Sequence, residues 1–190
     1  MKFTRNARKL IAAVALTGAA IALPAVALAA PGASGSAGAA AAAARCQRGF
    51  LTSWVGIPGG DTAGSTYYQL EISNVSGQTC TLHGFPGVSA VKAGGGQLGS
   101  AASRNHDSAE LTVTLKPYQT AHVLLQITDV GNFPPASCHA ATAVALRVYA
   151  PNDYGSMLIP FSFRACAKRG PIYLHVSPTI AGTGIPGYSI

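Results

Sequence analysis

Apolar and polar side chains alternate with a period of two over six stretches of the chain. In the first of these stretches, Leu70 and Ile72 flank the polar residue Glu71. Successive side chains of a β-strand point to opposite faces of the sheet, so each stretch predicts a strand with one buried face. The positions expected to face the core are Tyr68, Leu70, Ile72, Leu111, Val113, Leu115, Ala121, Val123, Leu125, Ile127, Val144, Leu146, Val148, Met157, Ile159, Phe161, Phe163, Ile172, Leu174 and Val176.

Short segments rich in Gly, Pro, Asn and Asp separate these stretches, and such residues form tight turns. The segments are 74–77, 94–96, 116–119, 151–153 and 169–171. Helical periodicity is weak after residue 44, and the single candidate for an amphipathic helix is 136–145. Short strands with regularly spaced turns predict an all-β domain, an Ig-like antiparallel β-sandwich of about seven to nine strands with Greek-key connections.

The first 29 residues predict a secretory signal peptide. Four basic residues near the N-terminus precede an apolar, alanine-rich stretch over 10–23. Small residues then occupy the positions that signal peptidase requires, and we expect cleavage after Ala29. A retained membrane anchor over 10–30 is the alternative, because this stretch is just long enough to span a bilayer.

The rest of the chain divides into three parts. Residues 30–45 consist almost entirely of Ala, Gly and Ser. Such a segment has little apolar surface to bury, so we expect a disordered linker. Residues 46–180 have the size of one ordinary domain and predict the single β-sandwich. Residues 181–190 contain three glycines and one proline, and we expect a flexible tail.

All four cysteines, Cys46, Cys80, Cys138 and Cys166, lie downstream of the predicted signal. An even number of cysteines in an exported chain indicates disulfides, which persist in oxidising compartments. Four cysteines allow three pairings, of which we predict Cys46–Cys80 and Cys138–Cys166. Each of these pairs would pin a chain end or a loop to a nearby strand. We therefore expect a secreted, extracellular protein, either free or retained at the cell envelope.

The charge of the chain argues against nucleic acid as a partner. The formal net charge is +7, with 13 Lys and Arg residues and six Asp and Glu residues. Four of the basic residues belong to the predicted signal, so the mature chain keeps nine basic and six acidic residues, a net charge of +3. These nine residues are scattered along the sequence, whereas a nucleic-acid site needs them clustered on one face. Membrane contact is expected only through the signal peptide before its cleavage.

Three segments, 70–88, 111–117 and 138–151, together carry a family resemblance. In the first, a strand ends in Asn, a tight turn follows, and then comes Cys-x-Leu-x-Gly-Phe-Pro-x-Val. The matching positions are Asn74, Cys80, Leu82, Gly84, Phe85, Pro86 and Val88. Over 46–178 the chain resembles a secreted actinobacterial family, the domain of unknown function 4232. The resemblance implies an exported, disulfide-bearing β-sandwich without accepted catalytic residues. At Pro117–Tyr118 the chain departs from the family's usual Pro-Gly.

An enzymatic interpretation depends on one adjacent pair, His106 and Asp107, within the polar stretch 103–108. An envelope hydrolase would combine this pair with a serine, but the chain has no Gly-x-Ser-x-Gly elbow. No motif around the six acidic residues indicates a glycosidase. The five histidines are dispersed, without His-x-x-x-His or Cys-x-x-Cys spacing. We therefore expect no catalytic residues, no metal and no cofactor.

Export, a long linker, a disulfide-braced sandwich and the lack of a recognisable catalytic motif together favour recognition of a partner, although the tyrosines also fit as ordinary surface residues of a sandwich. Aromatic side chains on outer strand faces stack on sugars or anchor proteins. The alternation places Tyr67, Tyr149 and Tyr173 on such faces. We expect an exported, non-catalytic module that binds a protein or glycan partner at the cell envelope through this surface. The alternatives are the envelope hydrolase that uses His106 and Asp107, and a purely structural envelope protein.

Overall fold

The computed structural model describes residues 43–62 and 64–184. The predicted signal peptide, residues 30–42 of the predicted linker and residues 185–190 lie outside the described residues. No helix in the described part of the chain is long and apolar enough to cross a membrane. The elements are η1 (Arg48–Phe50), β1 (Leu51–Thr62), β2 (Ser65–Asn74), β3 (Cys80–His83), β4 (Gly87–Val91), β5 (Gln97–Leu98), β6 (Ser103–Arg104), β7 (Thr112–Leu115), β8 (Thr120–Thr128), η2 (Val130–Asn132), α1 (Pro135–Cys138), β9 (Ala140–Tyr149), β10 (Ser156–Cys166), β11 (Leu174–Val176) and β12 (Ile180–Ala181).

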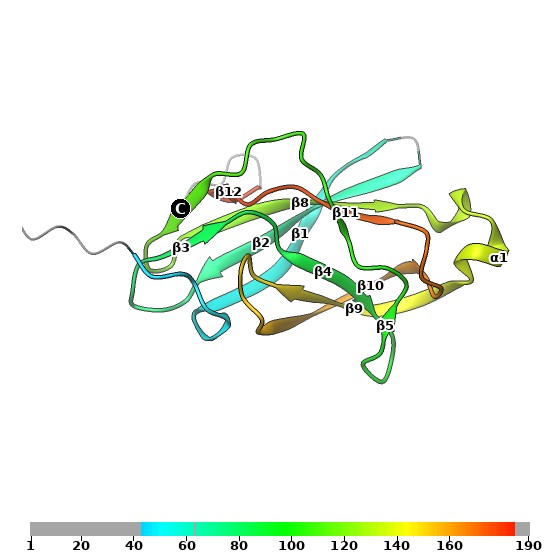
Figure 1. Ribbon diagram of the computed structural model, residues 1–190, viewed down its shortest axis with the longest axis horizontal. Coiled ribbons are helices and arrows are strands. Elements are labelled where there is room, and N and C mark those ends of the chain that lie inside the picture. The colour runs from blue at the N-terminus through cyan, green and yellow to red at the C-terminus, as the bar shows by residue number, and fades with distance from the viewer. Residues whose placement is uncertain (1–42, 63, 185–190) are drawn as a thin grey trace, which may run out of the picture. The chain divides into compact units, whose positions relative to one another are not determined.

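The strands form a β-sandwich, as predicted (Figure 1). One layer is a six-stranded sheet in the order β1-β2-β8-β11-β6, with β12 also paired to β8. The other layer is a four-stranded sheet in the order β10-β9-β4-β5, and β3 pairs with β7 in a small third sheet. All pairs are antiparallel except β11 with β6. Nine of the described strands are three residues or longer, and β5, β6 and β12 have two residues each.

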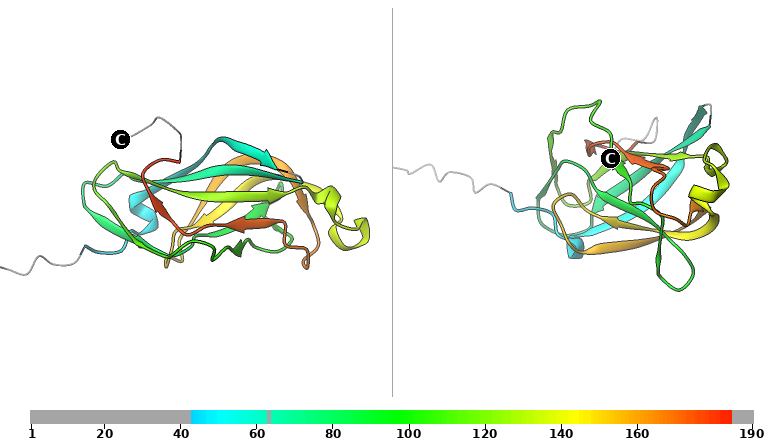
Figure 2. Two further views of the ribbon diagram at one scale, coloured as in Figure 1. Left: turned by 90° about the horizontal axis from the view of Figure 1, so that it is seen from above. Right: turned by 45° about the vertical axis from the view of Figure 1, so that its right-hand side comes forward.

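Strand β8 confirms the predicted alternation most clearly. Its residues Ala121, Val123 and Leu125 are fully buried, while His122 and Gln126 are half-buried on the opposite face. The strand runs through the middle of the six-stranded sheet, between β2 on one side and β11 on the other (Figure 2). Its inward face therefore packs into the core between the two layers, which the hydrophobic effect stabilises.

Three positions predicted to face the core are exposed: Leu111, Val144 and Ile172. Val144 lies opposite a β-bulge, where the pairing of β10 with β9 shifts between Pro160 and Phe163. A bulge interrupts the regular alternation of side chains. Leu111 and Ile172 precede the first residues of β7 and β11, so the period of a strand does not apply to them.

The helical candidate 136–145 is mostly strand. The helix α1 ends at Cys138, and His139 follows in the left-handed region with a φ of 46°. Strand β9 begins directly after it, at Ala140. Residues in the left-handed region commonly end helices, and here one residue joins the helix to the strand.

Both predicted disulfides are present, Cys46–Cys80 and Cys138–Cys166. The first ties the segment before η1 to the first residue of β3, and the second ties the end of α1 to the end of β10. All four cysteines are buried in the core cluster, and the described residues include no free cysteine. Two such disulfides indicate an oxidising, extracellular environment.

The departure from the family pattern, Tyr118, lies in the turn between β7 and β8. Tyr118 has a φ of 65°, in the region that glycine adopts without steric cost. Its backbone N–H donates to the carbonyl of Asn74, 2.8 Å away, and its side chain is 71% exposed. A glycine at this position, as in the family's usual Pro-Gly, therefore suits the turn better than the tyrosine present here.

The predicted tail begins inside the sheet. Ile180 and Ala181 pair with His122 and Ala121 of β8. The N–H of Gly182 then donates to the carbonyl of Thr120 at 3.0 Å. The hydrogen-bonded part of the domain thus extends beyond residue 180.

Candidate functional site

The three candidate tyrosines do not form one surface. Tyr67 is half-buried on β2 of the six-stranded sheet, and Tyr149 is half-buried on β9 of the four-stranded sheet. Tyr173 is completely buried, and its hydroxyl donates to the carbonyl of Leu98 at 3.0 Å. The prediction of an outward Tyr173 is wrong because this residue precedes β11, which starts at Leu174. Burial also raises the pKa of the Tyr173 phenol to about 12.

The candidate pair His106 and Asp107 lies in the exposed loop after β6. The His106 ring packs on Phe85, with 4.6 Å between the ring centroids, and its Nδ1 lies 3.5 Å from Glu110 Oε1. Among the described residues, no hydrogen bond joins His106 to a serine. A serine does meet a histidine elsewhere: Ser103 Oγ lies 2.7 Å from Nδ1 of His175, on neighbouring strands β6 and β11. His106 thus packs on Phe85 and interacts with Glu110.

The remaining histidines are dispersed over the fold. In the described part of the chain, no three His, Cys, Asp or Glu side chains gather as they would around a metal ion. Cys138, the neighbour of His139, is half of a disulfide. A cystine sulfur is not the thiolate that binds metals.

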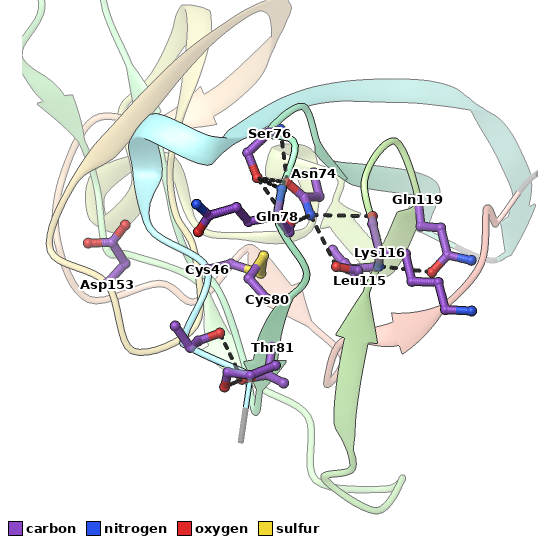
Figure 3. The surroundings of a disulfide bond; sticks show 12 residues. Cys46, Asn74, Ser76, Gln78, Cys80, Thr81, Leu115, Lys116, Gln119 and Asp153 are labelled. Carbon is purple, nitrogen blue, oxygen red and sulfur yellow. Dashed lines mark hydrogen bonds between the residues drawn. A yellow bond between two sulfur atoms is a disulfide. The ribbon is translucent and has the colours of Figure 1, made fainter. Parts of the chain in front are cut away.

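Asn74 is the centre of a hydrogen-bond network at the end of β2 (Figure 3). Its side-chain Nδ2 donates to the carbonyls of Gln78, Leu115 and Lys116, at 2.7, 3.1 and 3.3 Å. Its Oδ1 accepts from the N–H and the hydroxyl of Ser76, at 3.0 and 2.7 Å. One buried amide thereby joins the end of β2, the turn before β3 and the end of β7. The network lies beside the Cys46–Cys80 disulfide.

The other residues of the family motif also serve the fold. Leu82, Phe85 and Val88 belong to the hydrophobic core. Gly84 has a φ of 89°, a conformation that favours glycine. Its carbonyl accepts from both the N–H and the hydroxyl of Thr179, each at 3.0 Å. The motif therefore specifies packing and backbone geometry.

Comparison with protein families assigns the chain. Residues 46–179 match the family described as a domain of unknown function, DUF4232. The chain belongs to this family. The matched span starts at Cys46 of the first disulfide and ends next to β12, so the DUF4232 domain covers nearly the whole sandwich. Comparisons with curated proteins and with solved structures gave no match.

A hollow of about 370 Å³ lies at the end of the DUF4232 domain where the β1–β2 hairpin meets β10. The hairpin and the α1 segment both project at this end (Figure 1). We call this hollow the seam groove, because β1 and β10 are edge strands of different sheets. Its lining residues are Asp61, Thr62, Gly64, Ser65, Thr66, Tyr68, Ile127, Thr128, Asp129, Val130, Phe163 and Arg164.

Aromatic rings from the two sheets pack against one another beside the seam groove. Tyr68 of β2 and Phe161 of β10 pack edge to face, with 5.0 Å between the ring centroids. Phe163, two residues further along β10, lies 5.4 Å from Phe161. All three side chains are half-buried, and Tyr68 and Phe163 line the groove. The groove therefore has aromatic surface within reach of a ligand.

Polar groups form the rest of the groove. Hydroxyls of Ser65 and Thr128 lie 3.3 Å apart in one wall, and exposed Asp61 and Arg164 add opposite charges. Asp129 is held in place: its N–H donates to the Gly64 carbonyl at 2.8 Å, and its carboxylate accepts from the Gly131 N–H. Such a wall offers both donors and acceptors in fixed positions.

A second hollow of about 570 Å³ adjoins the seam groove. The two share Asp129, Val130 and Arg164, and the second continues along Phe133 and Pro135 towards α1. Half-buried Phe133 gives this extension a more apolar surface than the seam groove. A chain-like ligand in the seam groove would have room to continue past Arg164.

Sequence reasoning missed this groove. Tyr68 and Phe163 are predicted core positions, and they do pack against the core, but each also lines the groove. The period-two pattern gives the face of a strand and not its place in the sheet. The groove could have been located only with the knowledge that β10 is an edge strand next to the β1–β2 hairpin.

Proposed function

We propose that this protein is an exported, non-catalytic binding module whose seam groove takes a segment of a cell-envelope glycan. The observation that carries the proposal is the composition of the groove, in which the rings of Tyr68 and Phe163 lie among hydroxyls and charged groups. Aromatic side chains pack against the apolar faces of sugars. Hydroxyl and carboxylate oxygens, with a guanidinium, suit the hydroxyls at the ring edge of a sugar.

The volume of the seam groove favours a small-molecule or oligomer ligand over a protein partner that would bind through a flat surface. At about 370 Å³ the seam groove falls within the range typical of ligand pockets. The adjoining hollow gives a linear polymer room beyond one unit. Export is supported by the signal-like N-terminus and by the two disulfides.

The test is titration of the protein with soluble cell-wall glycan fragments by isothermal calorimetry. Arg164→Ala, Asp61→Asn and Phe163→Leu change a guanidinium, a carboxylate and an aromatic ring of the groove. We expect each to weaken binding by about tenfold, equivalent to about 1.4 kcal/mol. Arg169→Ala and Asp107→Asn make the same chemical changes at exposed positions outside the groove and should bind as the parent does.

Two results would overturn the proposal. One is the absence of saturable binding to any glycan fragment by the parent protein. The other is an equal loss of binding in the groove variants and in their matched controls. Product analysis after long incubation separates binding from hydrolysis, and we expect the glycans to remain intact.

A further inference from the structure

The C-terminal strap, residues 180–184, crosses the outer face of the six-stranded sheet. It starts as β12 beside β8, and the His122 side chain then hydrogen-bonds through Nδ1 to the carbonyl of Gly182 at 2.9 Å. Two residues later, the N–H of Gly184 donates to Oε1 of Glu71 at 3.0 Å. Because Glu71 lies on β2, the strap passes from one side of β8 to the strand on its other side.

The strap lies over an unusual row of side chains. Register places Trp54 of β1, Glu71 of β2 and His122 of β8 directly opposite one another. Glu71 is 0% exposed although it points away from the hydrophobic core. Its Oε2 has no hydrogen-bond partner, and neither has the buried Oε1 of Gln69 on the same face. A β-carbon at position 184 would overlap the Gln69 side chain, which would have to move to accept a larger residue there.

A charged carboxylate is poorly accommodated under the strap. Burial removes water from Glu71, and only one of its oxygens receives a hydrogen bond. A buried ionised group without full pairing is costly. Burial accordingly raises the pKa of Glu71, against the smaller opposing effects of the Gly184 N–H and of His122. Of the other strands beside Glu71, β1 presents the uncharged Trp54 opposite it and β8 presents His122.

We propose that the strap is a proton-controlled cover, which protonation of Glu71 closes over β2 and β8 and ionisation of Glu71 opens. Opening admits water to the carboxylate and exposes Glu71 between the indole of Trp54 and the imidazole of His122. The proton is taken from and returned to solvent, and no covalent bond changes. This face is separate from the seam groove, so the cover is a second device and does not depend on glycan binding.

The direction of the pH effect follows from linkage. Closing the strap raises the pKa of Glu71 above its ordinary value, so the closed form binds the proton more tightly than the open form. The stabilisation of the closed strap is therefore fully present below the ordinary pKa of a glutamate. It is lost as the pH rises through the raised pKa.

The experiment measures hydrogen exchange of the Gly182 and Gly184 amides between pH 4 and pH 8, corrected for the intrinsic exchange rate at each pH. In the parent protein we expect the protection of both amides to fall as the pH rises across this range, because ionisation of Glu71 removes the stabilisation of the closed strap. Fluorescence of Trp54, the single tryptophan of the chain, should report the same transition.

Glu71→Gln is the decisive variant. The glutamine stays neutral at every pH and keeps an oxygen that accepts from the Gly184 N–H. We expect its strap to remain protected over the whole range. Glu110→Gln, the same change at an exposed glutamate, should titrate as the parent does. Constant protection in the parent, or an unchanged pH response in Glu71→Gln, would overturn the proposal, provided that exchange in β9 shows both proteins folded.

Discussion

Replacing Asn74 with Asp should destabilise the domain far more than the loss of one hydrogen bond. Asn74 is 0% exposed, and its Nδ2 faces three carbonyl oxygens, those of Gln78, Leu115 and Lys116. Aspartate has the same shape but carries an acceptor oxygen where the asparagine has its NH₂ group. At neutral pH the substitution therefore directs a negative charge at three acceptors in a buried place.

The magnitude can be bounded from these contacts. Each intramolecular hydrogen bond contributes about 1 kcal/mol net, and a buried polar group left without a partner costs about 1–3 kcal/mol. Asn74→Ala should therefore lower the free energy of unfolding by about 3 kcal/mol. Asn74→Asp adds the cost of a buried charge, so about 4–5 kcal/mol is expected at pH 7. The free energy of unfolding of a domain is typically about 5–15 kcal/mol. This variant should therefore be close to unfolding.

Urea denaturation followed by Trp54 fluorescence measures the effect. Asn105→Asp is the matched control, because Asn105 is exposed and uses its Oδ1 to accept from the Asp107 N–H. Aspartate retains that bond, and a change within about 0.5 kcal/mol is expected. Acidification should restore part of the stability of Asn74→Asp, since a protonated carboxyl can donate one hydrogen bond. If Asn74→Asp costs no more than the control, the reasoning about this network is refuted.

Three further predictions concern stability. Replacing both Cys138 and Cys166 with Ala opens a loop of 28-residue separation and should cost about 3–4 kcal/mol in the chain-entropy estimate, measured by urea denaturation. Tyr118→Gly removes an exposed side chain from a left-handed position and should stabilise by up to about 1 kcal/mol, seen as a higher Tm; a lower Tm would contradict the turn argument. Tyr173→Phe leaves the Leu98 carbonyl without its donor and should cost about 1–2 kcal/mol. In ultraviolet titration of the folded protein, the tyrosine that ionises near pH 12 should be missing from this variant.

The sequence was most informative where the period of two applied without interruption. Strand β8 has its predicted inward face because nine successive residues share one extended conformation. The same rule failed at Val144 and at Tyr173, because a bulge and a strand end are set by partner strands that the local pattern does not contain. Both disulfides were predictable because four cysteines in an exported chain indicate two disulfides, and each of these disulfides joins two cysteines that are consecutive along the chain.

The site could not be predicted because its parts are distant in sequence. Tyr68 of β2 and Phe161 of β10 meet only after the two sheets pack against each other, and no local spacing records that meeting. Glu71 looked like an ordinary outward position of β2. Its Oε1 accepts from the N–H of Gly184, more than a hundred residues later, and the short strap 180–184 has no periodic pattern that would place it there.

The family motif and the proposed groove lie at different ends of the sandwich, and this separation explains why the motif identifies the family without revealing a function. Asn74 and the Cys46–Cys80 disulfide hold the end where β3 pairs with β7, whereas the groove opens at the end that carries α1 (Figure 1). A residue that fixes backbone geometry constrains every sequence that adopts the fold. Residues on the groove wall, such as Asp61 and Arg164, can change without disturbing that framework, because both are exposed. The proposed glycan site therefore has to be tested at the groove itself, because a sequence pattern that specifies folding says nothing about a ligand.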